Sequence, residues 1–221
     1  MTIVIGYSRK TKEGVRDAYI AHDSAITDDN GNRVDMHGIS EKFVRKGNSL
    51  ATGAGSTCYI LHKINKLFRA MNLSEKDLET LVREIDKNVM SELDEKERRY
   101  IKYNPNILLM HNPEIFLWTN DKVMPLIRIR DDSLICIGCG DSIAEGIDAN
   151  IQYLRSLNWL KKSAFDRLNL KENPVEYLRY IVSATCYVNT NCRPPVWVHH
   201  VSDQNIGIIT ECFDDDRMTS S

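Results

Sequence analysis

Two neighbouring stretches near the start of the chain, TIVIGYS (residues 2–8) and DAYIAH (residues 17–22), decide the fold. Each stretch is short and rich in β-branched and aromatic residues, and the polar segment between them holds Gly14. Two such runs joined by a polar, glycine-containing connection predict an antiparallel β-hairpin. A second pair of runs, at residues 42–45 and 49–53, flanks Gly47 and Asn48 and predicts another hairpin.

The rest of the chain alternates between helical and strand-like patterns. Apolar residues at helical spacing predict a helix through Ile60–Met71 and a second helix that begins at its cap, Ser74. A later helix is expected from near Asp141, and another is expected from Pro174 with Asn173 as its cap. The remaining strands are predicted at residues 106–111, 114–119, 122–129, 134–138, 196–201 and 206–211.

This order of elements (strands, two helices, strands, two helices, strands) predicts an α+β fold. We expect a four-layer αββα sandwich, in which two stacked antiparallel sheets carry a helix pair on each outer face, because the apolar side of each helix needs a sheet to pack against. No linker rich in proline, glycine or serine divides the sequence. A single domain is therefore expected over residues 1–212, followed by an acidic, flexible tail at 213–221.

The composition narrows the class of protein. Hydrophobic residues make up 42% of the 221 residues and charged residues 27%, with a formal net charge of -2, which is typical of a folded chain. Such a balance lacks the basic surplus that nucleic-acid binding needs. No apolar run approaches the roughly 18 residues of a membrane span, and the first residues do not resemble a secretion signal. We expect no nucleic-acid partner, no membrane partner and a cytoplasmic location.

The six cysteines do not predict a disulfide framework, because such frameworks belong to short secreted domains. Cys136 and Cys139 have the C-x-x-C spacing of zinc and redox sites, but no second half-motif completes a zinc ligand set. We therefore expect a buried strand at 135–137, with Cys139 in the turn after it, and no metal or other cofactor. His199 and His200 should point to opposite faces of their strand. His22, beside Asp23, could tune the candidate site described below, but we expect an ordinary packed or solvent-facing residue.

Thr2 offers the first candidate chemistry. After removal of Met1, this residue carries both a hydroxyl group and a free α-amine, whose reference pKa of about 7.7–8.0 lets it accept a proton near neutral pH. One residue then supplies a nucleophile and a base. The alternative is that Thr2 only opens a strand, as threonine often does.

Three further segments, read together with Thr2, favour the catalytic interpretation. They are DSAIT (residues 23–27), KF (residues 42–43) and ATGAGS (residues 51–56). In combination they resemble the proteasome β subunits and the bacterial HslV peptidase, which are N-terminal-nucleophile hydrolases. LICIGCGD (residues 134–141) also resembles this family's buried strand, its glycine-containing turn and the start of its helix. The resemblance extends over about 200 residues and implies the Ntn-hydrolase fold.

The resemblance implies a role for each catalytic position. Thr2 would be the nucleophile, and the charge of Lys42 would favour the deprotonated forms of its two groups. Asp23 would pair with Lys42, and the backbone N–H of Gly55 would stabilise the oxyanion. Cys139 stands where the family has a serine that assists the N-terminal amine. From composition alone, Asp23 and Lys42 could equally be solvated surface residues, and Gly55 could simply serve a tight turn.

The substrate-binding positions follow from the same resemblance. Thr27 and Thr57 would bind the substrate backbone as an added strand, and Gly53 would leave the side-chain pocket open. The chain departs from the family on its last helix, where Thr185 occupies the position of a supporting aspartate. A threonine cannot supply that charge.

The resemblance therefore implies a threonine peptidase that hydrolyses unfolded protein or peptide substrates. It also implies a homo-oligomeric ring served by a separate ATPase unfoldase, because the chain has no G-x-x-x-x-G-K-[ST] phosphate-binding loop. Two alternatives stay open. One is a non-catalytic, proteasome-like structural subunit, and the other is an Ntn amidase or peptide ligase. If Met1 is retained, the nitrogen of Thr2 is an amide and cannot act as a base.

Overall fold

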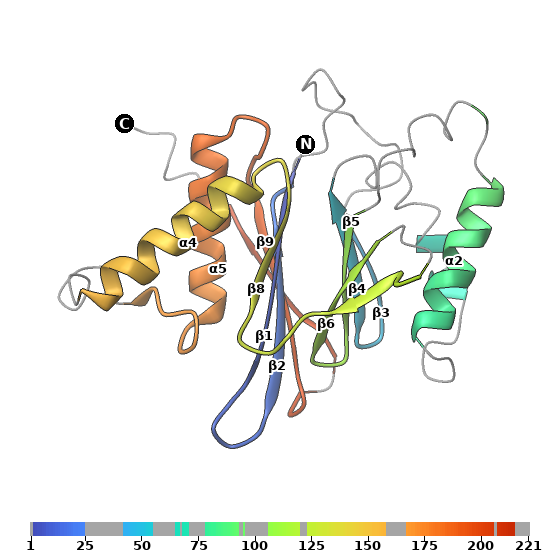
Figure 1. The fold of residues 1–221 in the computed structure, drawn as a ribbon, viewed down its shortest axis with the longest axis horizontal. Helices are drawn as coiled ribbons and strands as arrows, with labels where there is room; N and C mark the ends of the chain where they lie inside the picture. The colour runs from blue at the N-terminus through green and yellow to red at the C-terminus, as the bar shows by residue number, and fades with distance from the viewer. Residues whose placement is uncertain are drawn as a thin grey trace.

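In a computed structural model of the chain, the described residues are 2–24, 42–54, 65–66, 68–70, 78–92, 95, 106–119, 123–157, 167–205 and 207–214. They form an α+β structure with two antiparallel sheets and helices on the outer faces (Figure 1). The strands are β1 (Ile3–Lys10), β2 (Arg16–His22), β3 (Phe43–Lys46), β4 (Ser49–Ala54), β5 (Asn106–His111), β6 (Glu114–Trp118), β7 (Leu126–Arg128), β8 (Leu134–Gly138), β9 (Val196–Ser202) and β10 (Ile209–Phe213). The helices with bounds inside the described residues are α2 (Leu78–Glu92), α4 (Asp141–Ser156) and α5 (Pro174–Val188).

The first strand lies inside its sheet rather than at an edge. The first sheet has the order β10-β9-β2-β1-β8, and the second has the order β3-β4-β5-β6-β7. Val4 of β1 pairs with His22 of β2 on one side and with Ile137 of β8 on the other. Thr2, directly before β1, is therefore held at the end of a strand that is hydrogen-bonded along both sides.

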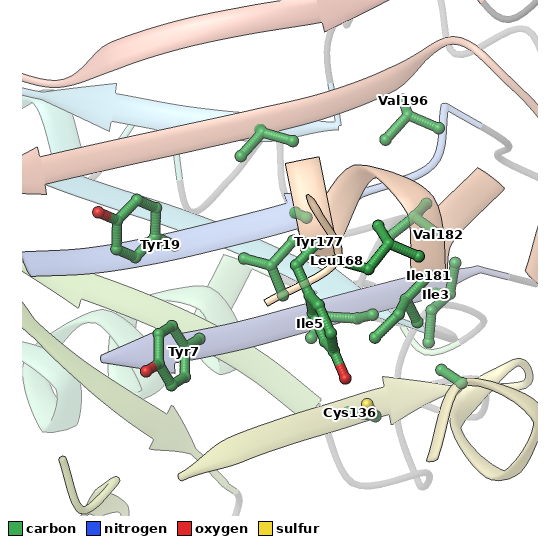
Figure 2. Packing of buried hydrophobic residues seen from close by; sticks show 14 of the residues in the cluster. Ile3, Ile5, Tyr7, Tyr19, Cys136, Leu168, Tyr177, Ile181, Val182 and Val196 are labelled. Carbon is green, nitrogen blue, oxygen red and sulfur yellow. The ribbon is translucent and has the colours of Figure 1, made fainter. Parts of the chain in front are cut away.

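The two sheets pack face to face, and alternate residues of β1 point in opposite directions. Val4 faces the second sheet and packs with Leu50 and Leu108. Ile3 and Ile5 face α4 and α5, which cover the outer face of the first sheet (Figures 1 and 2). Helix α2 covers the outer face of the second sheet. Its apolar residues pack against β4, β5 and β6 in one cluster, which is formed by Val44, Ala51, Phe68, Leu81, Val82, Ile85, Val89, Ile107, Leu109 and Trp118.

The hairpins and helices predicted from the sequence are confirmed where the chain is described, with changes at several ends. The strand expected at residues 122–129 is only Leu126–Arg128, because Pro125 has no N–H to donate to a ladder and Val123 and Met124 lie exposed. The last strand starts at Ile209 instead of residue 206, since Gly207 turns the backbone at φ +91°. Most of the helix expected at 60–71 and the cap at Ser74 lie outside the described residues.

Two smaller expectations are also corrected. Phe213 pairs with Val196, so β10 continues one residue past the predicted domain end at 212. Asn173 is the N-cap residue of α5 and Pro174 opens the helix, as predicted. The side chain of Asn173, however, makes no capping hydrogen bond and donates instead to the carbonyl of Arg167, 3.3 Å away. No helix among the described segments combines the length and the apolar character needed to cross a bilayer.

The contact between α2 and β6 includes a half-buried acid, Asp86. Both carboxylate oxygens of Asp86 lie 3.1 Å from Nε1 of Trp118, which donates a shared hydrogen bond. Burial raises the pKa of Asp86 to about 6, although the hydrogen bond opposes the shift. Between about pH 4 and pH 6 the folded protein therefore holds a proton that the unfolded chain has released. Folding stability falls as the pH rises through this window.

We predict that Asp86→Asn removes this pH dependence. From pH 4 to pH 6.5 the unfolding free energy of the wild type should fall by about 1–2 kcal/mol relative to the variant, a value discounted for the partial exposure of the carboxyl group. Urea unfolding followed by circular dichroism measures the difference. Glu84→Gln removes a charge from the same helix and should leave the wild-type profile unchanged; a parallel profile for Asp86→Asn contradicts the assignment.

Candidate active site

The candidate site is centred on the carboxylate of Asp23, which is fully buried. Its Oδ1 atom accepts hydrogen bonds from Lys42 Nζ at 2.7 Å, from the backbone N–H of Ile3 at 3.1 Å and from the hydroxyl group of Thr2. Its Oδ2 atom accepts from the backbone N–H of Arg193 at 3.1 Å. The structure thus brings together three of the residues singled out from the sequence: Thr2, Asp23 and Lys42.

The strand register explains why these side chains meet. Thr2 precedes β1 and Asp23 follows β2, and the pairing of Val4 with His22 places both at the same end of the first sheet. The N–H of Asp23 extends the ladder by donating to the carbonyl of Ile3 at 3.3 Å. Lys42 belongs to the second sheet, where it precedes β3 and its carbonyl accepts a hydrogen bond from Thr52 Oγ1 at 2.7 Å. The site therefore lies where the two sheets meet.

Lys42 and Asp23 form an ion pair that is buried inside the protein. The side chains of Lys42 and Asp23 are 1% and 0% exposed. Removing two charges from water costs several kcal/mol for each ion, which only close pairing and further hydrogen bonds can offset. The interpretation of these two residues as solvated surface charges is therefore wrong.

A turn with two glycines lies against Thr2. Gly138 has a φ of +111°, and a Cβ atom there would fall 2.0 Å from the carbonyl oxygen of Thr2. A Cβ atom at Gly140 would fall 2.7 Å from Cγ2 of Thr185. Cys139, between them, lies in the turn after β8 as predicted, and its thiol donates to the carbonyl of Thr2 at 3.6 Å. The glycines let this turn approach the nucleophile candidate closely.

Thr185 is buried on α5, but its hydroxyl donates to the carbonyl of Ile181, 2.8 Å away in the same helix. It supplies no charge to Asp23 or Lys42. The helix contributes instead through Asn189, which follows α5 and whose side-chain amide donates to the carbonyl oxygen of Cys139 at 3.3 Å. Sequence reasoning did not single out Asn189.

The other predicted substrate-binding and oxyanion positions are only partly described. Gly53 is buried in β4, opposite Ile107 of β5. Ala54, the last residue of β4, has its Cβ atom 3.2 Å from the place a Cβ would take at Gly138, so this strand ends beside the glycine turn. Thr27, Gly55 and Thr57 lie outside the described residues.

A buried pair of histidines also supports Asp23, and sequence reasoning missed it. His22 Nδ1 lies 2.8 Å from the carbonyl oxygen of Asp23, and His22 Nε2 lies 3.0 Å from His199 Nε2. His199 Nδ1 lies 2.9 Å from Thr210 Oγ1. Burial lowers the pKa of His22 to about 3 and that of His199 to about 2, so both rings are neutral at pH 7. His199 is buried and His200 only half-buried, which confirms that they point to opposite faces.

Each neutral imidazole ring has one donor nitrogen and one acceptor nitrogen, and the hydrogen-bond partners determine which is which. The carbonyl of Asp23 can only accept, so His22 donates from Nδ1 and accepts at Nε2. His199 then donates from Nε2, and its Nδ1 accepts from the hydroxyl of Thr210. These hydrogen bonds connect the backbone of Asp23 to β10, the edge strand of the first sheet. His22 and His199 lie 177 positions apart, and no sequence pattern connects two histidines at that separation.

Cys136 behaves as a core residue. It lies on β8 within the cluster between the first sheet and its helices (Figure 2), and burial raises the pKa of its thiol to about 12. The predicted buried strand at 135–137 is confirmed as part of β8. Within the described ranges, no three His, Cys, Asp or Glu side chains come together in a group that could hold a metal ion.

No protein-family model matches this chain. A comparison with curated proteins likewise found none with a similar sequence.

We predict that Gly138→Ala destabilises the protein by about 2–4 kcal/mol, because the new Cβ meets backbone and the residue must keep a positive φ. Gly146→Ala is the matched control. Gly146 lies in α4 with open space around it, so its substitution should raise the unfolding free energy by about 0.5–1 kcal/mol. Chemical denaturation of the two variants measures both effects. Equal stability of Gly138→Ala and the wild type contradicts the close approach of the turn to Thr2.

Proposed function

We propose that this chain is an N-terminal-nucleophile hydrolase of the proteasome β and HslV type, a threonine peptidase that hydrolyses peptide bonds through Thr2 once Met1 is removed. The observation that carries this proposal is the buried cluster of a hydroxyl group, a carboxylate and an ammonium group formed by Thr2, Asp23 and Lys42. The cluster joins the position before the first strand to residues from both sheets.

The arrangement of layers supports the same proposal. Two antiparallel sheets stack between α4 and α5 on one side and α2 on the other, as the resemblance to the Ntn-hydrolase fold implies (Figure 1). A residue directly before an internal strand is held in place, because that strand is hydrogen-bonded along both sides. β1 is such a strand, because it is paired with β2 and with β8.

The proposed chemistry starts from a free amine. While Met1 is attached, the nitrogen of Thr2 is an amide whose lone pair is delocalised, and it cannot accept a proton. Once Met1 is removed, the amine takes the hydroxyl proton while Oγ1 attacks the scissile carbonyl carbon. The peptide C–N bond then breaks, the leaving amine takes that proton, and an ester to Thr2 remains. Water, deprotonated by the same amine, attacks the carbonyl carbon of this ester. The bond from that carbon to Oγ1 breaks, the amine returns the proton to Oγ1, and the acid is released.

Lys42 and Asp23 assist these reaction steps through their charges. The ammonium group of Lys42 stabilises negative charge that develops on Oγ1 of Thr2, and Asp23 holds the ammonium group in place at 2.7 Å. The carboxylate also accepts the hydrogen bond from Thr2 and so orients the hydroxyl group. Cys139, whose thiol meets the carbonyl of Thr2, takes the place of the family's serine beside the amine.

The oxyanion donor and the substrate-binding residues stay predictions. Gly55 follows Ala54 directly in the chain, and Ala54 lies beside the glycine turn, which supports the assignment of the Gly55 N–H as the oxyanion donor. Thr27 and Thr57 are proposed to bind the substrate backbone, and Gly53 is proposed to open the side-chain pocket. The homo-oligomeric ring, the separate ATPase unfoldase, the cytoplasmic location and the flexible tail also stay predictions.

We predict that the purified protein lacks Met1 and cleaves fluorogenic peptides, and that Thr2→Ala lowers the rate by roughly 10³-fold or more because it removes the nucleophile. Intact mass spectrometry and the peptide assay measure the two effects. Thr2→Ser keeps a hydroxyl group and should retain activity, and Thr119→Ala, at the end of β6, should match the wild type. Retention of Met1 together with no cleavage favours the structural-subunit alternative, and transfer of the acyl group to added amines favours the ligase.

We predict that Lys42→Met lowers kcat by roughly 10²-fold or more, because the charge beside Oγ1 is lost. It should also destabilise the fold by about 3–5 kcal/mol, since Asp23 is left buried without its cation. Lys46→Met is the control, because Lys46 ends β3 on the surface and its ammonium group donates an exposed hydrogen bond to the carbonyl of Arg69 at 2.7 Å.

Combining Lys42→Met with Asp23→Asn removes both charges and separates the two roles of the pair. The double variant should recover much of the lost stability, whereas its activity should stay low. Peptide assays and urea unfolding of the three variants measure both quantities. Recovery of activity in the double variant contradicts a catalytic role for Lys42.

A further inference from the structure

Two cysteine side chains meet beside Thr2, although they lie far apart in the sequence. Cys192 belongs to the buried cluster between the first sheet and its helices, and Cys139 packs against the same cluster. The Sγ atom of Cys192 also lies 3.3 Å from the place a Cβ would take at Gly140, the residue after Cys139. Both thiols are free in this structure. The partner of Cys139 is therefore Cys192, not the Cys136 of the C-x-x-C spacing.

The segment that holds Cys192 also holds the carboxylate of the site. The N–H of Cys192 donates to the carbonyl of Asn189 at 2.9 Å, which closes a tight turn after α5. The next residue, Arg193, donates its N–H to Asp23 Oδ2, and its carbonyl accepts from the N–H of Ser24 at 3.0 Å. A displacement of Cys192 is thus passed to Asp23 through one residue of backbone.

The surroundings of Cys139 favour its reactive form. Its sulfur receives the hydrogen bond from the thiol of Cys192, and the side-chain amide of Asn189 approaches it at 3.7 Å. A hydrogen bond from Cys192 lowers the pKa of the Cys139 thiol below its usual range, so the proton that this thiol donates to the carbonyl of Thr2 is more easily lost. The same bond and burial raise the pKa of Cys192. Cys139 is partly exposed and Cys192 is buried. A partly exposed thiolate next to a second thiol is the usual arrangement of a peroxide-sensitive pair.

We propose that Cys139 and Cys192 form a redox-modification site, in which a small peroxide converts the two thiols to a disulfide and thereby switches off the chemistry at Thr2. The effect on activity rests on the proposed peptidase function, whereas the disulfide itself does not. The oxidant is hydrogen peroxide or an organic hydroperoxide small enough to reach Cys139.

The steps balance in atoms and electrons. The thiolate of Cys139 attacks one peroxide oxygen, the O–O bond breaks, and hydroxide leaves, so that Cys139 becomes a sulfenic acid. The sulfur of Cys192 then attacks the sulfenic sulfur, the S–O bond breaks, and the hydroxyl group leaves as water with the proton of Cys192. The two sulfurs lose two electrons and the peroxide gains two. A dithiol reductant reverses the change by thiol–disulfide exchange.

Formation of the disulfide alters two contacts of the site. The sulfurs must close to about 2.05 Å, which draws the glycine turn and the segment at 189–193 together. Cys139 loses its proton and can no longer donate to the carbonyl of Thr2. Arg193 moves with Cys192, so the N–H that holds Asp23 Oδ2 shifts and the carboxylate is reoriented. Both changes act on groups that the proposed mechanism needs in fixed positions.

The test treats the reduced full-length protein with hydrogen peroxide, quenches it with catalase, and alkylates the remaining free thiols. Mass spectrometry of the non-reduced digest should show a peptide linked through Cys139 and Cys192. Peptide cleavage should fall by at least ten-fold and recover on addition of dithiothreitol. A link between any other two cysteines, or none at all, overturns the inference.

Two variants sharpen the result. Cys192→Ala should prevent the disulfide, leaving the sulfenic acid of Cys139 to be trapped by dimedone. Cys212→Ser removes an exposed cysteine and should leave both the link and the peroxide response as in the wild type. If the link forms while cleavage is unchanged, the switch is wrong. If the reduced protein never cleaves peptides but the link forms, the proposed peptidase function fails and the modification site stands.

Discussion

The carboxylate of Asp23 is the constraint on which the site depends, because a charge without access to water must have its oxygens satisfied by donors. The donors come from separate parts of the chain: the backbone of Ile3 on β1, the ammonium group of Lys42 from the second sheet and the backbone of Arg193 after α5. Each of these segments has to sit correctly for the cost of burial to be offset. The same requirement places the hydroxyl group of Thr2 against the carboxylate.

The ion pair between Asp23 and Lys42 also joins the two sheets. The sheets also meet through the more exposed ion pair of Arg16 with Glu114 and through apolar contacts such as Val4 with Leu50, which are non-directional and tolerate sliding. A 2.7 Å bond between opposite charges tolerates much less. The apolar core therefore supplies most of the stabilisation, and the ion pair specifies how the two layers line up at the end that carries Thr2.

Local patterns in the sequence predicted the structural features that depend on residues close together in the chain. Strand-like runs and helical spacing found the hairpins, α4 and α5, and the motif at 23–27 with Lys42 marked two members of the buried cluster. The contacts that were missed are made by backbone groups or between distant side chains, such as Arg193 with Asp23 and His22 with His199. A main-chain N–H can belong to any residue except proline, and a pair 177 positions apart leaves no periodicity.

In the proposed family Cys139 stands where a serine is usual, and one difference in chemistry between the two side chains has several consequences. A thiol is a weaker donor than a hydroxyl group, so its hold on the carbonyl of Thr2 is looser. It is also far more acidic and can be oxidised, which a serine cannot. The turn after β8 must carry glycine on both sides of this position, so the sulfur lies against Thr2 and beside Cys192. The departure that loosens the hydrogen-bond network is thus the one that makes the site sensitive to its redox surroundings.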